Sequence, residues 1–362
     1  MRLVPDSGLW TTGTLAQPTP LRAVLEVSGA VLSWTVDAPS ADAQIAFTAM
    51  SRADWLWRVL GESGHGAVAS AIDDRVPDDV RTVELAGVDV LPGSLDPLRR
   101  LALGHWLKRW WPASNRDGIA TLDAALLDAE IAVLTVAAQD FFTDDTFDSD
   151  VTAMLAPHTA ALNALVQQGD PRVLELVAKC TELAEELGVT VERRVGPSRR
   201  DDYALAAGAE PGRQAPGAVA TGVDSIAWGA VPAGIFDAAE NTVDWSVQTA
   251  DETVTAVVRT ELAGAGLPDG IAVRLQSGQL GGAGVLGDDG RTEFPIVDSH
   301  KRAITESVAW DHDWRATTVT VGAGVDESAQ TRDRVRVFAR SRLAAPPADA
   351  FLAEILVAEA DY

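Results

Sequence analysis

The sequence W-D-H-D-W at residues 310–314 places two carboxylates beside one imidazole, which are side chains that bind divalent metal ions. If this segment is extended, His312 shares a face with the two tryptophans, while Asp311 and Asp313 point the opposite way and cannot chelate the same ion. In a turn the three side chains could converge. The alternative, which we favour, is that the tryptophans anchor the edge of a β-domain and that no metal is bound.

Five aspartates crowd the segment Q-D-F-F-T-D-D-T-F-D-S-D at residues 139–150, namely Asp140, Asp144, Asp145, Asp148 and Asp150. Calcium-binding loops place their ligands at alternate positions around a glycine that makes the sharp turn. This segment has neither the spacing nor the glycine. We therefore predict a solvated loop that caps the following helix.

Two motifs resemble sites of cofactor binding or catalysis. Residues 282–287, G-A-G-V-L-G, match G-x-G-x-x-G, but a dinucleotide site needs a helix after the loop, whereas an Asp-Asp-Gly turn and another strand candidate follow. This pattern predicts a glycine-rich strand. Residues 61–65, G-E-S-G-H, differ from the G-x-S-x-G nucleophile elbow because His65 replaces the last glycine and no strand leads into the motif.

The single cysteine, Cys180, and two of the histidines, His105 and His158, fall in predicted helices. A nucleophilic cysteine needs an adjacent activating group, and the sequence places none beside Cys180. We expect core or surface roles for all three. The sequence thus predicts no catalytic residue, no cofactor and no metal.

The predicted helix over 96–111 interleaves cationic and aromatic residues, a composition that can stack on bases or lie at a membrane surface. Its leucines are typical of core contacts, however, and the net charge of −24 opposes binding to a phosphate backbone. No apolar run is long enough to span a membrane. We expect neither a nucleic acid nor a membrane as partner.

Residues 331–343, T-R-D-R-V-R-V-F-A-R-S-R-L, alternate between apolar and basic positions. As a β-strand this segment would bury one face and present a row of arginines on the other. One interpretation is that the arginines pair with acids on a neighbouring strand. The other is that they dock the acidic surface of another protein. The candidate partner-binding residues are Arg332, Arg334, Arg336, Arg340 and Arg342.

The spacing of apolar residues predicts an α+β protein with several domains. Residues 1–194 form a mixed, mainly helical domain that begins with a β-hairpin over 22–37, residues 195–221 form a linker, residues 222–345 form an antiparallel β-sandwich, and residues 346–362 form a C-terminal helix. Further helices are predicted at 54–62, 66–72, 119–142, 150–168 and 170–187. Strands are predicted at 81–90, 242–248, 253–262, 271–276, 291–296, 316–321 and 332–343.

Residues 271–296 contain a strand, a small-residue segment and an Asp-Asp-Gly turn that leads into a strand with Phe294. This run of about 25 residues resembles the carboxypeptidase-regulatory and transthyretin-like β-sandwiches, which are Ig-like domains. The resemblance implies a sandwich fold with a buried phenylalanine. It implies no active site.

The composition indicates the cellular environment of the protein. One cysteine in 362 residues excludes an intramolecular disulfide, and the bias to arginine and alanine over lysine is typical of a high-GC bacterial genome. Pro5 and Asp6 interrupt the N-terminal sequence before an apolar run can form, so we expect no signal peptide and a cytoplasmic location. The expected function is a noncatalytic adaptor or regulatory subunit that binds another protein. The alternative is a hydrolase-type enzyme whose site residues are dispersed in the sequence.

Overall fold

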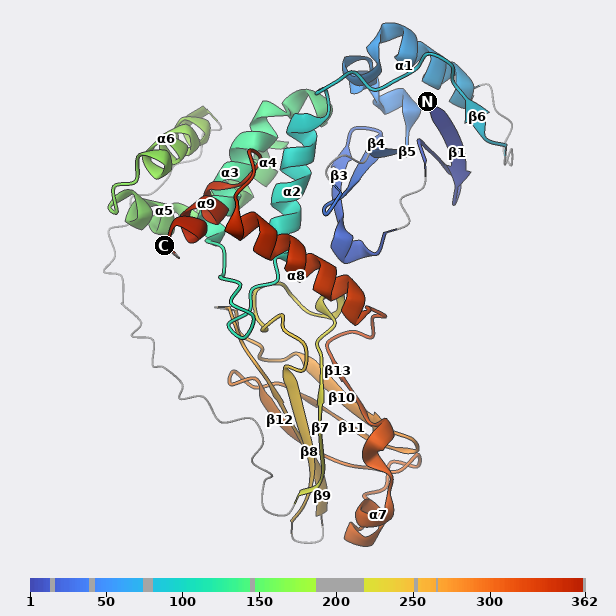
Figure 1. Ribbon diagram of the computed structural model, residues 1–362, viewed down its shortest axis with the longest axis vertical. Helices are drawn as coiled ribbons and strands as arrows, with labels where there is room; N and C mark the ends of the chain where they lie inside the picture. The colour runs from blue at the N-terminus through green and yellow to red at the C-terminus, as the bar shows by residue number, and fades with distance from the viewer. Residues whose placement is uncertain are drawn as a thin grey trace. The chain divides into compact units, whose positions relative to one another are not determined.

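The computed structural model is described for residues 1–13, 17–38, 43–73, 81–143, 147–186, 218–250, 253–264 and 266–360. It is an α+β protein with antiparallel sheets. The chain divides into two compact units, drawn in Figure 1. Unit one contains residues 1–110, 122–194 and 334–362, and unit two contains residues 111–121 and 195–333.

Unit one combines helices with one antiparallel sheet of strand order β3-β4-β5-β2-β1-β6. Its strands are β1 (Arg2–Asp6), β2 (Leu9–Thr11), β3 (Arg22–Val27), β4 (Ala30–Thr35), β5 (Gln44–Phe47) and β6 (Val83–Glu84). Its helices are α1 (Trp57–Asp73), α2 (Asp96–Trp110), α3 (Ala124–Ala137), α4 (Phe147–Leu155), α5 (Thr159–Val166), α6 (Pro171–Glu186) and α9 (Leu352–Ala360).

The predicted hairpin over 22–37 is confirmed as β3 and β4, which pair antiparallel from Val27 and Ala30 outwards. Gly29 in the turn has φ 74°, a conformation that favours glycine. Along β3 the burial alternates: Leu25 and Val27 are buried, whereas Glu26 between them is exposed. The pleat of this strand therefore sets the direction of the Glu26 carboxylate.

Helix α3 is central to unit one, as its nearly continuous apolar sequence predicts. It contacts α2, α4, α6 and α9. Asp123 caps its N-terminus by accepting hydrogen bonds from the Ala125 and Leu126 N–H groups at 2.9 and 3.0 Å. Helix α2 packs against β3, and the Trp106 indole N–H donates to the Pro20 carbonyl at 2.9 Å.

Several predicted helices have different bounds in the structure. The segment 150–168 is interrupted at Pro157, where a 3-10 turn (Ala156–His158) separates α4 from α5, because proline cannot supply the N–H that a continuous helix needs. Of the segments 54–62 and 66–72, residues 54–56 form a 3-10 turn and the rest lies in α1, whose two parts are divided by the non-helical backbone of Gly61. Of the strand predicted at 81–90, only β6 (Val83–Glu84) forms.

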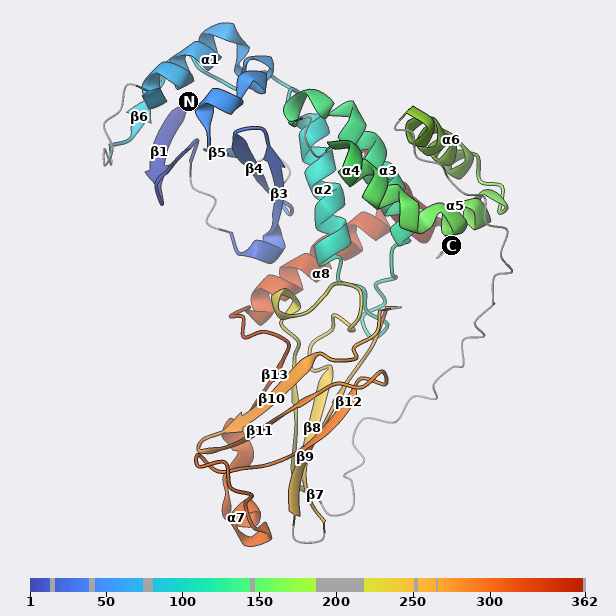
Figure 2. The same ribbon diagram turned by 180° about the vertical axis from the view of Figure 1, so that it is seen from behind.

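Unit two contains two antiparallel sheets, with strand orders β12-β9-β8-β7 and β11-β10-β13. Buried residues of both sheets form one hydrophobic core, in which Val258 and Leu275 are fully enclosed. Figure 2 shows these strands from behind. Their bounds, with the short helix between them, are β7 (Ala218–Asp224), β8 (Val243–Ala250), β9 (Thr253–Thr260), β10 (Ala272–Ser277), β11 (Leu280–Val285), β12 (Arg291–Pro295), α7 (Glu306–Asp311) and β13 (Thr318–Val321).

The sequence-based strand over 332–343 is wrong, because these residues belong to helix α8 (Ala329–Ala344). Ser328 caps the helix by accepting a hydrogen bond from the Thr331 N–H at 3.1 Å. The buried positions recur at three- and four-residue intervals: Thr331, Arg332, Val335, Arg336, Ala339 and Arg342. The arginines therefore point around a helix, and no arginine row exists on one sheet face.

The division of the chain differs from the sequence-based one at both ends of unit two. The boundary falls inside α8, so residues 334–345, expected in the β-domain, belong to unit one. Residues 111–121 belong to unit two, where the buried Asp237 accepts hydrogen bonds from Ser114 Oγ at 2.6 Å and Asn115 N at 2.7 Å. The expected linker over 195–221 lies outside the described residues except for its last four, which begin β7. The predicted C-terminal helix is confirmed as α9.

Among the helices described, none has the length and apolar character needed to cross a bilayer.

Candidate functional site

The five candidate arginines of α8 have different surroundings. In unit two, Arg332 is buried and donates to both Glu240 carboxylate oxygens, at 2.9 Å from Nε and 2.7 Å from Nη2. In unit one, Arg334 donates to Asp37, and the buried Arg342 donates to Glu354 and Asp349. Arg336 is buried and Arg340 exposed, and both also interact with other residues. Pairing with carboxylates of the same chain, one of the two interpretations of the sequence, is thus observed for Arg332, Arg334 and Arg342, although on a helix and not on a strand.

The other side chains considered from the sequence also have structural roles. His312 Nε2 lies 2.9 Å from Ser277 Oγ, and its ring packs edge-on against Trp314, which belongs to the core of unit two, as expected of an anchor, whereas Trp310 is exposed. Within the described ranges, no group of three or more histidine, cysteine or acidic residues could hold a metal ion. Gly282–Val285 lies within strand β11, as predicted.

In unit one, Cys180 is buried in α6, where burial raises the pKa of its thiol to about 11. The G-E-S-G-H segment lies inside α1. His158 Nε2 lies 2.8 Å from Asp128 Oδ2, and the Lys108 ammonium lies 2.6 Å from the other oxygen of Asp128. These groups satisfy one another within the fold.

The acidic segment at 139–150 divides into parts with different roles. Asp140 forms an ion pair with Arg58 at 2.9 Å. Asp144 and Asp145, and the side chain of Asp148, lie outside the described residues. Asp150 is exposed on α4 and lines a pocket.

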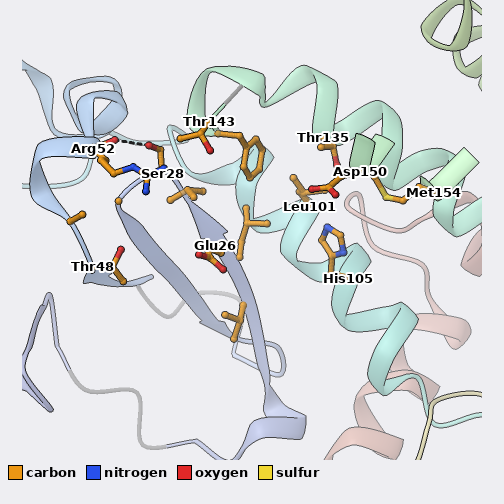
Figure 3. Close-up of a pocket in the computed structure, with 16 residues that line it drawn as sticks. Glu26, Ser28, Thr48, Arg52, Leu101, His105, Thr135, Thr143, Asp150 and Met154 are labelled. Atoms are coloured by element: carbon orange, nitrogen blue, oxygen red, sulfur yellow. Dashed lines mark hydrogen bonds between the residues drawn. The ribbon is translucent and has the colours of Figure 1, made fainter. Parts of the chain in front are cut away.

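This pocket has a volume of about 550 Å³ and lies wholly in unit one (Figure 3). The β3–β4 hairpin contributes Glu26, the segment after β5 contributes Arg52, α2 contributes His105 and α4 contributes Asp150. Apolar surface comes from Val24, Leu101 and Met154. The volume falls in the range of sites that hold small molecules, roughly 300–1,000 Å³.

The four ionisable side chains of the pocket, Glu26, Arg52, His105 and Asp150, share a property that the α8 arginines lack. None of them makes a side-chain hydrogen bond or ion pair with any residue whose position is described. Two of the pocket hydroxyls are different, because Ser28 donates to the Arg52 carbonyl at 2.7 Å and Thr135 donates to the Ile131 carbonyl at 2.8 Å, whereas the hydroxyls of Thr48 and Thr143 bond to no residue whose position is described. The charged groups therefore retain their full capacity to bind a ligand.

His105 is exposed by its surface area, but partial desolvation of its ring lowers its pKa from the ordinary value of 6.5, and the nearby Lys108 ammonium acts in the same direction. Asp128 opposes this shift without reversing it. The imidazole is consequently neutral at pH 7, with one nitrogen able to accept a hydrogen bond or a proton.

A second pocket of unit one, of about 510 Å³, illustrates why the first is the better candidate. It is lined by Asp37, Arg99, Arg342 and Asp349 around apolar residues that include Trp34. Its charged groups bind each other or other residues: Asp37 pairs with Arg334, and Asp349 pairs with Arg342 and Arg99. They have less capacity left for a ligand.

Sequence reasoning considered His105 and Asp150 separately, rejected both as site residues, and did not consider Glu26 or Arg52. The four residues lie on three helices or loops and one strand, up to 124 positions apart from Glu26 to Asp150. The local sequence indicates only one feature of this site, the alternation along β3 that directs Glu26 away from the buried face. Their convergence depends on how the hairpin packs against α2.

Comparison with protein-family models, with curated proteins and with solved structures gives no match to this chain.

Proposed function

We propose that this protein is a noncatalytic regulatory subunit that binds a small polar molecule in the pocket of Figure 3. The observation that carries the proposal is that Glu26, Arg52, His105 and Asp150 line one pocket without partners among the described residues. Charged side chains that are not used by the fold are available to a ligand.

The noncatalytic assignment rests on the hydroxyl groups of the same pocket. A nucleophilic serine or threonine needs a base within hydrogen-bond reach, roughly 2.6–3.2 Å. Ser28 and Thr135 donate to backbone carbonyls, and His105 forms no hydrogen bond with these two hydroxyls or with those of Thr48 and Thr143. This arrangement supports binding over covalent catalysis.

The binding proposal is tested by thermal-shift measurements of the full chain against amino acids, amines, carboxylates, phosphates and nucleotides. We expect at least one class to raise the melting temperature of the wild type, and the double variant Glu26→Gln/Asp150→Asn to lose that response. The matched control Glu293→Gln/Asp244→Asn makes the same two changes in unit two. A response that the pocket variant keeps in full places the binding elsewhere and contradicts the proposal.

The pocket variants are suited to this test because they should fold normally. Glu26, Arg52 and Asp150 are exposed and make no internal ion pair among the described residues. Substitution of such side chains changes the free energy of unfolding by about 0.5 kcal/mol or less. Loss of ligand response in these variants then reports on the site and not on stability.

A hydrolase remains the second candidate, favoured by one observation: the lowered pKa of His105 leaves a neutral imidazole near two carboxylates. A neutral histidine can act as general base on a water molecule. Hydrolysis of a panel of fluorogenic esters, amides and phosphates tests this function. Turnover by the wild type that is lost in His105→Gln would establish it and replace the noncatalytic proposal.

Binding of a protein partner, expected for a regulatory subunit, stays a proposal, and two of the α8 arginines, Arg332 and Arg342, pair with Glu240 and Glu354 of the same chain. The bacterial origin and cytoplasmic location stay predictions from composition. We also propose that unit two is an Ig-like β-sandwich, as the resemblance of residues 271–296 implies. The core common to its two sheets and the burial of Phe294 support this class.

A further inference from the structure

The ionisable groups of the pocket are separated by charge. In the view of Figure 3, Arg52 lies at the hairpin side, whereas His105 and Asp150 lie at the helical side, with Glu26 between them. At pH 7 the two carboxylates outnumber the single guanidinium, because His105 is neutral. The pocket thus has a cationic end and a more extensive anionic side.

Each end selects a different ligand group. A guanidinium presents paired N–H donors that match the two oxygens of a carboxylate. The carboxylates of Glu26 and Asp150 accept hydrogen bonds from an ammonium group, and a neutral His105 can accept one more. A ligand with one negative and one positive end fits this distribution better than one with a single sign of charge.

Part of the pocket lining is apolar. Val24 and Met154 line the same pocket as the charged groups, so the ligand can also bury aliphatic groups. A pocket of about 550 Å³ also has room for more than a single amino acid.

We propose that the ligand is a zwitterion of the amino-acid or short-peptide type, with its carboxylate on Arg52 and its ammonium on Glu26, Asp150 and His105. This inference rests on the proposed small-molecule function of the same pocket. It adds the class of ligand and the direction in which the ligand lies.

The test uses calorimetric titration of the full chain with the tripeptide Ala-Leu-Ala in three forms: with free termini, N-acetylated, and C-amidated. We expect the free peptide to bind tightest, and each blocked form to bind roughly tenfold or more weakly, since a hydrogen bond to a charged group contributes about 1.5–3 kcal/mol. Equal binding of all three forms, or binding of none, overturns the proposal.

Two variants test which terminus of the peptide binds which side chains. Arg52→Gln should bind the free and the C-amidated peptide alike, because the partner of the carboxylate is gone. Asp150→Asn should reduce the difference in affinity between the free and the N-acetylated peptide. It should leave the difference in affinity between the free and the C-amidated peptide unchanged. Reversed effects would place the peptide in the opposite direction and contradict the assignment.

Failure of this inference is distinguishable from failure of the proposed function. If the peptides do not bind but an amine, a phosphate or a nucleotide stabilises the wild type and not Glu26→Gln/Asp150→Asn, the pocket is a ligand site and only the zwitterion proposal falls. If no compound distinguishes the wild type from that variant, both fall.

Discussion

Arg342 of α8 and Glu354 of α9 are both buried and form a two-pronged ion pair, with Nη2 and Oε2 2.8 Å apart. The same Glu354 carboxylate accepts a hydrogen bond from the Phe351 N–H at 2.8 Å, and Arg342 also donates to Asp349 at 3.0 Å. A buried charge needs such a complete set of partners. This pair fixes the C-terminal helix of unit one to α8.

The first prediction concerns this pair. Glu354→Ala leaves Arg342 buried with Asp349 alone, and breaking a buried pair costs about 3–5 kcal/mol in the free energy of unfolding. The matched control, Glu359→Ala, removes an exposed carboxylate of the same helix that pairs with Arg172, and it should cost much less because solvent screens an exposed ion pair. Urea denaturation measures both. Similar losses in the two variants would refute a buried role for Glu354.

The second prediction separates helix from strand at residues 331–343. Val337 is exposed in the interior of α8. On a helix, Val337→Ala raises stability by up to about 0.5 kcal/mol because alanine has the higher helix propensity. On a strand the same change lowers stability. The melting temperature of the variant gives the sign, and a decrease would favour the strand predicted from sequence.

The third prediction concerns Cys180, the only cysteine of the chain. Burial raises the pKa of its thiol to about 11, and Sγ donates to the Ala129 carbonyl at 3.6 Å. Because the thiolate is the reactive form, the folded protein should resist iodoacetamide at pH 8 and react fully in denaturant. Mass spectrometry of intact protein counts the adducts. Rapid labelling without denaturant would show that the thiol is accessible.

The fourth prediction is a pH dependence. Because the pKa of His105 in the folded protein lies below its ordinary value of 6.5, the unfolded chain binds more protons than the folded protein just below pH 6.5. Stability from this group is present above pH 6.5 and is lost as the pH falls towards the folded pKa. The charged groups that surround the ring or line its pocket are Lys108, Asp128, Glu26, Arg52 and Asp150.

His105→Gln removes this dependence, so its melting temperature should fall less between pH 7.5 and pH 5.5 than that of the wild type. His300→Gln, a change at an exposed histidine of unit two, serves as the control and should behave as the wild type does. An equal fall in all three proteins would show that His105 has no depressed pKa.

The fold was predictable where local signals and tertiary packing agree. The Ser28-Gly29 turn between two alternating runs gave the hairpin, and the apolar stretch around Leu126 gave the central helix. The strand predicted at residues 331–343 was wrong because arginines at every second position are also compatible with a helix, where they fall on several faces. A long guanidinium side chain can be buried when carboxylates such as Glu240 and Glu354 meet it. Ser328 before the segment was the capping signal that pointed to the helix.

The candidate site was not predictable from the sequence. Which charged residues are satisfied inside the fold and which remain open depends on contacts between distant segments. Arg332 and Arg52 have the same chemistry, yet the first is buried against Glu240 and the second faces a pocket. The spacing of charged residues along the chain does not distinguish the two arginines.

The imidazole of His105 offers the most direct test of the pocket as a ligand site. The chain has five histidines, so ¹⁵N-labelled imidazole signals can be assigned with single His→Gln variants and followed by NMR as ligand is added. We predict that Ala-Leu-Ala with free termini shifts the His105 signals and leaves those of His300 and His312 in place. Unchanged His105 signals at saturating peptide, or shifts confined to the other histidines, would contradict the account.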